Sequence, residues 1–588
     1  MPLLLSAIRA RHRRVHHLAI AHLVRGLAPN SERNPMHAEI PVAHIVGRTL
    51  AVRGVDTVYG VVGSGNYEAT SALRGGGARF IAARHEGAAV SMADAHHRAS
   101  GRIAAVTVHQ GPGLTNALTA LGEAAKSGVP LVVLAGAAAA SARRSNFLVN
   151  QEALAVSVGA GVETLTSPET AAADTARAHQ RAREEMRPIV LNMPIDLQEV
   201  GVAFDPAGIP APRERTHALP ATDALDRAVA ELRHATRPVI VAGRGAWLSG
   251  AGATLSRLAE RLNAPLMTSA MALGMFAGDP RDRGICGGFS DPQGVETLES
   301  ADLLLAVGAS LTSWTTRGGS VFAAHQRIIR VDSSPTSIDA GVSHETLLHG
   351  DADATARALL DRLGGETPRS TALRLRAESR DPEPRTGAPT TRTTRAVSGW
   401  VDADAATVLL DTMLPEQRTL VVDGGHFIGW PVRGIRVPDP SGFIFSSAGF
   451  QSIGLGMGSA VGAAIARPDR LTVLATGDGG YQMAISELET MIRLQLPILV
   501  AVYNDAAYGA EVHHFGPDEP FVDQVRFPAV DIAAAAAGAG ATGLTVTTLE
   551  ALERVKPWME DPRGPLVLDM RIDPSVSGPW AEQDFLRH

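Results

Sequence analysis

Short runs of apolar, often β-branched residues alternate with alanine-rich stretches along most of the chain. Residues 58–62, 131–134 and 498–502 are three such runs. A continuous apolar run of this length is typical of a strand that is buried on both faces, so we predict parallel sheets covered by helices. The pattern therefore indicates an α/β fold.

The pattern falls into three blocks that are separated by two stretches of weak periodicity. Proline is frequent in residues 200–217, and threonine, arginine and proline are frequent in residues 364–400, which indicates linkers. Residues 1–36 carry several arginines and histidines but none of the pattern, and we interpret them as a basic N-terminal extension without function. We therefore predict three doubly wound parallel-sheet domains, at residues 37–200, 218–363 and 401–588.

Composition and charge exclude several classes of function. A net charge of −7 at pH 7 argues against nucleic acid as the main partner, because phosphate binding needs a basic surface. No apolar run is long enough to cross a membrane. Cys286 is the single cysteine, which excludes an internal disulfide and a metal site built from cysteines. A reducing, cytoplasmic location is expected.

Acidic residues follow two of the predicted strands in the third block. Gly477-Asp478-Gly479-Gly480 comes directly after one strand, and Asn504-Asp505 ends the next. Open α/β sheets bind ligands at the carboxyl ends of their strands, and glycines let the backbone approach a phosphate closely. Carboxylate and diphosphate oxygens suit Mg²⁺. Gly-Asp-Gly by itself is also an ordinary turn, and only its pairing with the second strand end predicts a cation and diphosphate site.

This pairing resembles the signature of the thiamine-diphosphate (ThDP) dependent superfamily of 2-oxo acid decarboxylases and acetolactate synthases, in which Gly-Asp-Gly is followed by Asn-Asn. The resemblance covers nearly all of residues 37–588 and implies a pyrimidine-binding, a central and a diphosphate-binding domain, with ThDP and Mg²⁺ as cofactors. It assigns the metal ligands to Asp478, Asp505 and the backbone carbonyl of Ala507. Asp505 departs from the family, which usually has asparagine there.

Three further segments resemble cofactor-binding motifs of this superfamily. Arg84-His85-Glu86 matches the motif whose glutamate hydrogen-bonds N1′ of the aminopyrimidine ring. Gln451-Ser452-Ile453 matches the segment whose bulky apolar residue, here Ile453, lies beneath the two rings, although core packing is an alternative for that residue. The carbonyl of Gln451 would accept from the 4′-amino group. The remaining residues that the resemblance places at the cofactor are Gly424, Gly425, His426, Gly477, Gly479, Gly480, Asn504, Tyr508 and Gly509.

Four residues bear on the reaction. His109 stands where benzoylformate decarboxylase has an active-site histidine, with Gln110 beside it in a segment that resembles the family's Gly-Pro-Gly-x-Thr-Asn turn. Glu511 matches an acidic residue of pyruvate decarboxylases. Gln151, in Asn150-Gln151-Glu152, resembles the substrate-side Phe-Gln-Glu of acetolactate synthases, with asparagine in place of phenylalanine. His109 and Glu511 are candidate acids or bases, but a structural histidine and a solvated glutamate are the alternatives.

The resemblance implies an acetolactate-synthase-like carboligase that decarboxylates a small 2-oxo acid and transfers the resulting acyl carbanion to a second carbonyl. His109 and Glu511 favour the alternative, a benzoylformate-decarboxylase-like enzyme that releases an aldehyde. A ThDP-binding protein without catalysis is the third reading, against which the intact Glu86, Asp478 and Ile453 argue.

The resemblance also implies a homodimer or homotetramer in which Glu86 of one subunit meets the ThDP of another. The central block resembles the FAD-binding domain of acetolactate synthases. Gly243-Arg244-Gly245 after a strand is a weak nucleotide signal, so FAD is not favoured.

Overall fold

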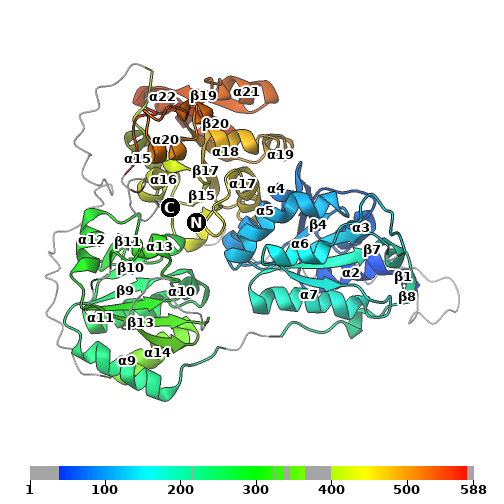
Figure 1. Cartoon of the computed structure of the whole chain (residues 1–588), viewed down its shortest axis with the longest axis horizontal. Helices are drawn as coiled ribbons and strands as arrows, with labels where there is room; N and C mark the ends of the chain where they lie inside the picture. The colour runs from blue at the N-terminus through cyan, green and yellow to red at the C-terminus, as the bar shows by residue number, and fades with distance from the viewer. Residues whose placement is uncertain are drawn as a thin grey trace, which may run out of the picture.

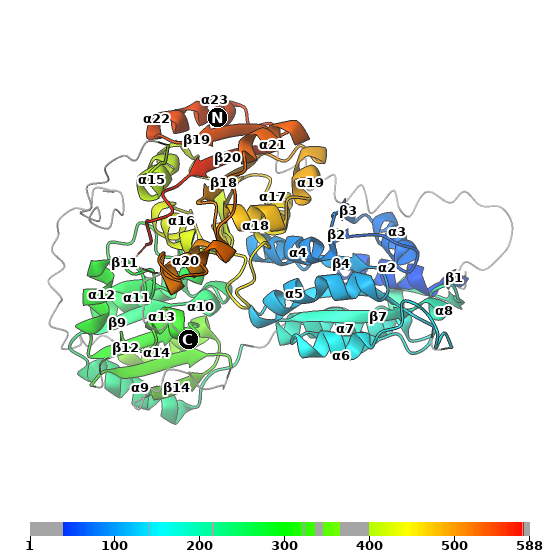
Figure 2. The same ribbon diagram turned by 45° about the horizontal axis from the view of Figure 1, so that its top comes forward.

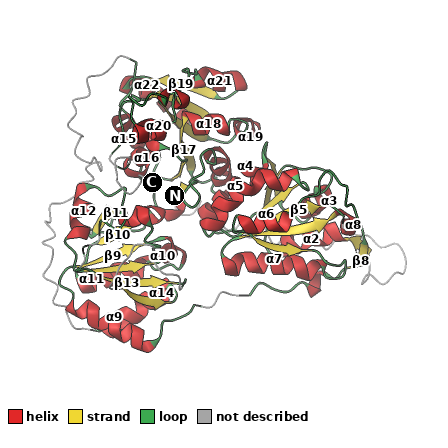
Figure 3. Cartoon of the chain, viewed as in Figure 1, coloured by secondary structure: helices red, strands yellow, loops and turns green. Residues whose placement is uncertain are grey.

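The computed structural model describes residues 39–578 and 580, except 140, 214–216, 322, 324, 335–344 and 365–398. Three six-stranded parallel sheets, each covered by helices, occupy separate regions of the molecule (Figures 1 and 3). The predicted α/β class and its three doubly wound sheets are thereby confirmed. The predicted extension 1–36 and most of the predicted linker 364–400 lie outside the described residues.

The first sheet has the strand order β3-β2-β4-β5-β7-β6. Every residue of β2 and β4 is buried, as expected of strands that helices cover on both faces. The strands are β2 (Thr57–Gly60), β3 (Arg79–Ala82), β4 (Ala105–Val108), β5 (Leu131–Ala137), β6 (Gly161–Thr164) and β7 (Pro188–Pro194). The helices are α2 (Val42–Val52), α3 (Tyr67–Gly75), α4 (Glu86–Ser100), α5 (Pro112–Lys126), α6 (Gln151–Ser157), α7 (Ala171–Glu185) and α8 (Ile195–Gln198).

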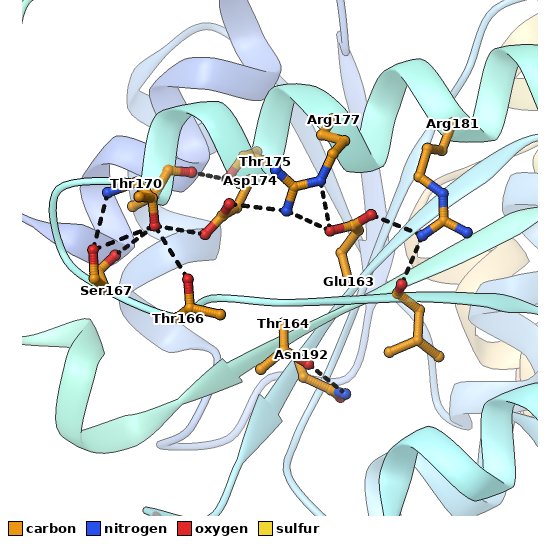
Figure 4. A network of polar contacts seen from close by, with 12 residues as sticks. Glu163, Thr164, Thr166, Ser167, Thr170, Asp174, Thr175, Arg177, Arg181 and Asn192 are labelled. Atoms are coloured by element: carbon orange, nitrogen blue, oxygen red, sulfur yellow. Dashed lines mark hydrogen bonds and ion pairs between the residues drawn. The ribbon is translucent and has the colours of Figure 1, made fainter.

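An ion-pair network covers the edge strand β6 of this sheet (Figure 4). Glu163 of β6 contacts Arg177 at 2.6 Å and Arg181 at 2.7 Å, both on α7, and Arg177 also contacts Asp174 at 2.9 Å. Charged side chains along an edge strand discourage pairing with a foreign strand.

A two-stranded antiparallel sheet, β1 (Glu39–Pro41) with β8 (Gly201–Ala203), is a feature that the sequence pattern did not predict. Each strand has three residues, which is too short for a hydrophobic period to be recognised. The pairing ties the segment that leaves the first domain back to the point where the domain begins.

The central sheet has the order β11-β10-β9-β12-β13-β14, the arrangement found in many dinucleotide-binding folds. Strand order alone does not show a ligand. The strands are β9 (Pro238–Ala242), β10 (Leu266–Thr268), β11 (Asp282–Ile285), β12 (Leu303–Val307), β13 (Arg327–Asp332) and β14 (Glu345–His349). The helices are α9 (Thr222–His234), α10 (Arg244–Leu248), α11 (Gly252–Leu262), α12 (Pro292–Glu299), α13 (Ser313–Thr316) and α14 (Ala352–Leu363).

The third sheet, β16-β15-β17-β18-β20-β19, repeats the order of the first when the strands of each domain are counted from its start. Its strands are β15 (Arg418–Val422), β16 (Phe443–Phe445), β17 (Leu471–Gly477), β18 (Ile498–Asn504), β19 (Thr542–Val546) and β20 (Leu566–Arg571). Its helices are α15 (Ala403–Met413), α16 (Gly429–Gly434), α17 (Gly456–Ala466), α18 (Asp478–Met483), α19 (Glu487–Arg493), α20 (Gly509–Phe515), α21 (Ile532–Ala539), α22 (Leu549–Leu552) and α23 (Lys556–Glu560). The strand order reverses between β15 and β17, the point at which such sheets bind ligands.

The first and third domains pack together through α4 and α17, which lie side by side in both views (Figures 1 and 2). Small residues allow this close approach. A Cβ on Gly458 would lie 2.8 Å from the carbonyl oxygen of Ala88, and a Cβ on Gly462 would collide with the backbone of Met92. The two helices therefore join the domains through one continuous apolar core.

Among the residues that the structure describes, every helix is too short or too polar to span a bilayer.

Candidate active site

Asp478 and Asp505 emerge from the carboxyl ends of adjacent parallel strands. β17 and β18 pair in register, with Gly477 opposite Tyr503. Asp478 is the first residue of α18, and Asp505 follows the last residue of β18. The structure thus brings together the two carboxylates that the sequence places at the metal.

The two carboxyl groups sit in an environment that favours a bound cation. Burial raises the pKa of both Asp478 and Asp505, and for Asp505 the charge of Asp478 adds to the effect. Asp505 is 4% exposed, and its Oδ2 has no hydrogen-bond partner among the described residues. A divalent cation would offset both charges and would occupy that oxygen. The described residues contain no group of three His, Cys, Asp or Glu side chains that could hold a metal ion, so a cation here would complete its coordination with backbone and phosphate oxygens.

Ala507, the third predicted ligand, is buried beside this pair. Its N–H donates to Asp505 Oδ1 at 3.2 Å, which fixes the backbone that carries its carbonyl.

His426 closes the other side of the pair. Its Nε2 lies 3.6 Å from Asp505 Oδ2 and has no hydrogen-bond partner among the described residues. Burial lowers the pKa of His426 to about 3, and His513 adds to the effect, so the imidazole is neutral at pH 7. A neutral imidazole can donate one hydrogen bond to a phosphate oxygen without forming an ion pair with Asp505.

Glycines make room for this arrangement. A side chain at Gly509 would collide with Asp505 and His426, and a Cβ on Gly480 would lie 2.8 Å from Asp423 Oδ2. Gly425 adopts a φ of 146°, which favours glycine. These positions account physically for glycines that the sequence only marked as a motif.

Asp423 is a residue of the site that no sequence motif predicted. It is completely buried, and its carboxylate accepts hydrogen bonds from Gly424 N at 2.9 Å, Gly454 N at 3.2 Å and Thr476 Oγ1 at 3.3 Å. Burial raises the pKa of Asp423 to about 6, against the lowering effect of these donors. One carboxylate therefore ties the loop after β15 and the loop before α17 to strand β17.

Ile453 lies beside two glycines, Gly424 in the loop after β15 and Gly480 in α18. A Cβ on Gly424 or on Gly480 would come within 3.3 Å of its side chain. Ile453 is nevertheless 41% exposed, so core packing within this chain does not explain it. Ser452 is half-buried, and Gln451 is exposed with a left-handed φ of 54°. Strained backbone of this kind is concentrated at ligand-binding loops.

Glu86 begins α4 and is 9% exposed. Asn116 Nδ2 donates to its Oε2 at 3.0 Å, while a Cβ on Gly113 would lie 3.5 Å from its Oε1. The beginning of helix α5, which contains Gly113 and Asn116, therefore orients the glutamate. The sequence motif around Gly113 did not by itself connect Asn116 to Glu86.

His109 and Gln110 follow β4 on the same side of the first domain. Gly65 N donates to His109 Nδ1 at 3.2 Å, so the neutral ring carries its proton on Nε2. A Cβ on Gly113 would lie 3.3 Å from His109 Cβ, so His109 and Glu86 both lie beside that glycine. Gln110 is buried, with no hydrogen-bond partner for Oε1 among the described residues.

Gln151 is held by the protein at both ends of its amide. Its Oε1 accepts from Gly111 N at 3.0 Å, and its Nε2 donates to Asn192 Oδ1 at 2.8 Å. These bonds fix the turn after His109. A direct contact of Gln151 with substrate stays a prediction.

Glu511 and Tyr508 are exposed beside the diphosphate-side loops. Glu511 lies on α20 with its neighbours Ala510 and His514 also exposed. Tyr508 is 37% exposed, and its ring meets Phe527 edge-on at 4.8 Å. A role of Glu511 as an acid also stays a prediction.

Asn504 holds the loop that carries Asp505. Its Nδ2 donates to Asp569 Oδ1 at 2.7 Å, and its Oδ1 accepts from Ala506 N at 3.1 Å. The bend places Ala506 at a φ of 54°, a left-handed conformation that costs an alanine free energy.

Replacing Ala506 with glycine is expected to raise the free energy of unfolding by about 1 kcal/mol, because glycine adopts this conformation without a Cβ clash. The midpoint of thermal unfolding measures the effect. Ala507→Gly is the matched control, since Ala507 has no positive φ, and its midpoint is expected to fall. A lower midpoint for Ala506→Gly would contradict the strain argument.

Models of three protein-family domains match the chain. They describe the N-terminal TPP-binding domain of thiamine pyrophosphate enzymes at residues 40–155, the central domain at residues 225–359 and the C-terminal TPP-binding domain at residues 423–570. Each match lies within a different one of the three domains. The chain belongs to the thiamine pyrophosphate enzymes. Thiamine pyrophosphate is another name for ThDP, so the first and third domains are the two ThDP-binding domains, and the resemblance to acetolactate synthase-like proteins is confirmed.

Several characterised or named relatives of this thiamine pyrophosphate enzyme align over most of its length. The probable 2-ketoarginine decarboxylase of Pseudomonas aeruginosa is 32% identical over 79% of this chain and 81% of its own. The putative acetolactate synthase large subunit of Mycobacterium tuberculosis is 29% identical over 91% of this chain and 98% of its own. The sulfoacetaldehyde acetyltransferase of Rhodobacter capsulatus is 30% identical over 86% of this chain and 89% of its own. These names include both a decarboxylase and acyl-transferring enzymes.

The glycines of the central domain have a packing explanation. A side chain at Gly243 would collide with the backbone of Gly308, and a Cβ on Gly245 would lie 2.9 Å from Gly308 Cα. The two glycines of Gly243-Arg244-Gly245 are therefore explained by the close approach of the segment after β9 to Gly308, which follows β12. The expectation that FAD is not favoured stays a prediction.

Proposed function

We propose that this thiamine pyrophosphate enzyme uses Mg²⁺ and ThDP to decarboxylate a small 2-oxo acid and to transfer the acyl group to a second carbonyl compound. The observation that carries the proposal is the similarity over 91% of this chain to a putative acetolactate synthase large subunit.

When bound, ThDP supplies a nucleophilic carbon, C2 of its thiazolium ring, and accepts the electrons left by loss of CO₂. Asp478, Asp505 and the Ala507 carbonyl would hold Mg²⁺ at the diphosphate. Glu86 would share a proton with N1′ of the aminopyrimidine, and Asn116 keeps the glutamate side chain in place for that exchange. The exposed face of Ile453 would support the rings.

A decarboxylase that releases an aldehyde is the second candidate, and one observation favours it. His109 lies beside Gly113, as Glu86 does, and the neutral ring carries its proton on Nε2, so it could donate that proton to the product side of a substrate. The relative named as a 2-ketoarginine decarboxylase fits the same reading.

One assay separates the two candidates from a protein without catalysis. The purified protein is mixed with ThDP and Mg²⁺, and pyruvate, an aromatic 2-oxo acid or 2-ketoarginine is added while CO₂, aldehyde and acyloin are measured separately. Acyloin in excess of aldehyde supports the proposal, and aldehyde alone supports the second candidate. ThDP binding without turnover of any 2-oxo acid would contradict both.

We also propose a homodimer or homotetramer of cytoplasmic location, in which Glu86 of one subunit faces the ThDP of another. Large exposed apolar side chains on both ThDP-binding domains support an assembly, because apolar surface of this kind often marks a contact between proteins. They are Leu148 at 54% and Phe147 at 39% exposure in the first domain, and Phe515 at 64% and Phe521 at 67% in the third.

Binding of Mg²⁺ is expected to strengthen as the pH rises toward neutrality. In the unfolded chain an aspartate loses its proton near about pH 3.9. In the metal-free native protein Asp478 and Asp505 keep their protons to higher pH, because the pKa of each is raised. The stability that these protons provide is therefore present at acid pH and is lost as the pH rises through the raised values. A cation must displace the same protons.

Calorimetric titration with Mg²⁺ and ThDP in buffers of different ionisation enthalpy measures the protons released on binding. Thermal unfolding of the metal-free protein between pH 5 and 8 measures the loss of stability. Asp505→Asn is the control, since a neutral ligand leaves less charge to neutralise and should reduce both effects. Affinity for Mg²⁺ that does not vary with pH would refute the coupling.

A further inference from the structure

Two buried glutamates reach across the boundary between the ThDP-binding domains and bind backbone N–H groups of the opposite domain. Glu123, on α5 of the first domain, accepts from Gly449 N at 3.0 Å and from Phe450 N at 2.7 Å. Glu487, the first residue of α19 in the third domain, accepts from Arg84 N at 2.9 Å and from His85 N at 3.1 Å. Glu123 is 2% exposed and Glu487 is completely buried.

The two contacts are equivalent in the two domains. Residues 84 and 85 lie between β3 and α4, and residues 449 and 450 lie between β16 and α17, which occupy the same places in the common strand order. The glutamates likewise lie on helices that follow the corresponding strands β4 and β17. Each domain therefore holds the same loop of the other, on either side of the packed helices α4 and α17.

Each of the held loops leads into a residue that the proposed function places at the aminopyrimidine ring. Glu86 follows Arg84 and His85 directly, and Gln451 follows Gly449 and Phe450. The backbone immediately before both cofactor contacts is thus fixed by a carboxylate from the opposite domain.

We propose that Glu487 and Glu123 are positioning residues for catalysis: Glu487 fixes the backbone that presents Glu86, and Glu123 fixes the backbone that presents Gln451 and Ile453. This inference rests on the proposed function. Hydrogen bonds from N–H groups to a buried carboxylate are among the stronger ones in proteins, and a donor left without its partner in a buried site is costly. Removing either carboxylate should free the loop that it holds.

The surroundings of the two carboxylates differ, and the difference provides a test. Glu487 Oε1 accepts both N–H groups, while its Oε2 accepts, among the described residues, only from the hydroxyl of Thr490 at 2.7 Å. A glutamine can keep the first oxygen and donate to the hydroxyl with its amide group, so Glu487→Gln should preserve the contact. Glu487→Ala should not.

Both oxygens of Glu123 face donors that a glutamine cannot all satisfy. Oε2 accepts from Phe450 N, and Oε1 accepts from Ser127 Oγ at 2.7 Å and from Arg98 Nη2 at 3.4 Å. Gly449 N donates to both oxygens, at 3.0 and 3.1 Å. If the amide NH₂ of a glutamine replaced either oxygen of Glu123, it would face an N–H group that also donates. The negative charge that faces Arg98 would be lost as well. Glu123→Gln should therefore behave like an alanine substitution, in contrast to Glu487→Gln.

Two measurements follow the two loops. Hydrogen exchange of backbone amides, by mass spectrometry on the protein without cofactor, reports whether residues 84–85 and 449–450 are protected. Hydrogen–deuterium exchange at C2 of bound ThDP, stopped by acid and measured by proton NMR, reports whether Glu86 is in place and does not require turnover. The ThDP dissociation constant is measured in parallel by titration.

Glu487→Ala is expected to speed amide exchange at residues 84–85 and to slow C2 exchange, each by about tenfold or more, with less than about threefold change in ThDP affinity. Glu487→Gln is expected to restore both. Glu123→Gln is expected to expose residues 449–450 and to weaken ThDP binding by about tenfold, with residues 84–85 still protected.

Matched controls disturb the same contacts between domains without touching the N–H groups. Glu489→Gln removes the exposed 2.6 Å ion pair with Arg84, and Lys126→Met removes the cation above the Phe450 ring, 4.7 Å from its centre. Both should leave amide exchange, C2 exchange and ThDP affinity as in the unsubstituted protein.

Two results would overturn the inference. One is unchanged protection of residues 84–85 in Glu487→Ala. The other is lost protection without any slowing of C2 exchange, which would make the contact purely structural. Failure of the proposed function is recognised separately: C2 exchange on the unsubstituted protein would then be no faster than in free ThDP, whatever the amide exchange shows.

Discussion

Replacement of Glu86 by glutamine is expected to lower the turnover number by a factor of about 10² to 10⁴, while Mg²⁺-dependent binding of ThDP stays nearly unchanged. A carboxyl group can share a proton with a ring nitrogen, whereas an amide at the same place cannot. The substitution should not disturb the fold, because an amide oxygen can still accept the 3.0 Å hydrogen bond from Asn116 Nδ2. Steady-state kinetics and a ThDP titration measure the two quantities.

The matched control for this prediction is Glu184→Gln, which removes a carboxylate from an exposed position near the end of α7 in the same domain. It should leave the turnover number as it is. If Glu86→Gln kept more than about a tenth of the turnover number, Glu86 would not have the role that we assign to it.

Replacement of Asp478 by alanine is expected to weaken Mg²⁺-dependent binding of ThDP by more than about 100-fold. Loss of a residue that only hydrogen-bonds a metal ligand commonly lowers metal affinity by about 10- to 100-fold, and loss of a ligand itself should cost more. The same change should make the protein more stable in the absence of metal at pH 7. It removes the half-buried carboxyl of Asp478, and with it the negative charge that, in addition to burial, disfavours ionisation of Asp505. Titration calorimetry and thermal unfolding of the metal-free protein measure the two effects.

Asp505→Asn is the control for Asp478→Ala, because an asparagine retains an oxygen ligand. Its ThDP affinity is expected to stay within about tenfold of the unsubstituted protein. A tightly bound cofactor in Asp478→Ala, or a loss of stability in the absence of metal, would show that Asp478 serves the fold and not the cation.

The strands show how far local pattern reaches. Residues 498–502 are an uninterrupted apolar run, and the structure continues it as the buried strand β18 up to Asn504. β1 and β8 escaped prediction because three residues carry no recognisable period and their pairing joins segments on either side of the first domain. The apolar runs did not predict the order of the strands in each sheet either, because that order depends on how the crossover helices pack.

The site divides in the same way. Asp478 and Asp505 could be placed together from the sequence because each follows a strand and parallel strands end at the same edge. Asp423 could not be assigned to the site from the sequence. Its carboxylate accepts hydrogen bonds from the N–H groups of Gly424 and Gly454 and from the hydroxyl of Thr476, and these donors come together only in the folded domain. The bond from Asn116 to Glu86 joins two recognised motifs that the sequence left separate.

The sequence by itself determined the α/β class, the three sheets and the ThDP-enzyme family, because apolar runs, glycines and strand-end acids are local and each reflects a local physical demand. Only the tertiary structure decided what single polar groups do. Glu123 and Glu487 look like ordinary helix residues in the sequence, yet each is buried against backbone N–H groups more than 300 residues away. The role of a carboxylate depends on which donors lie within about 3 Å of it, and packing alone sets those neighbours.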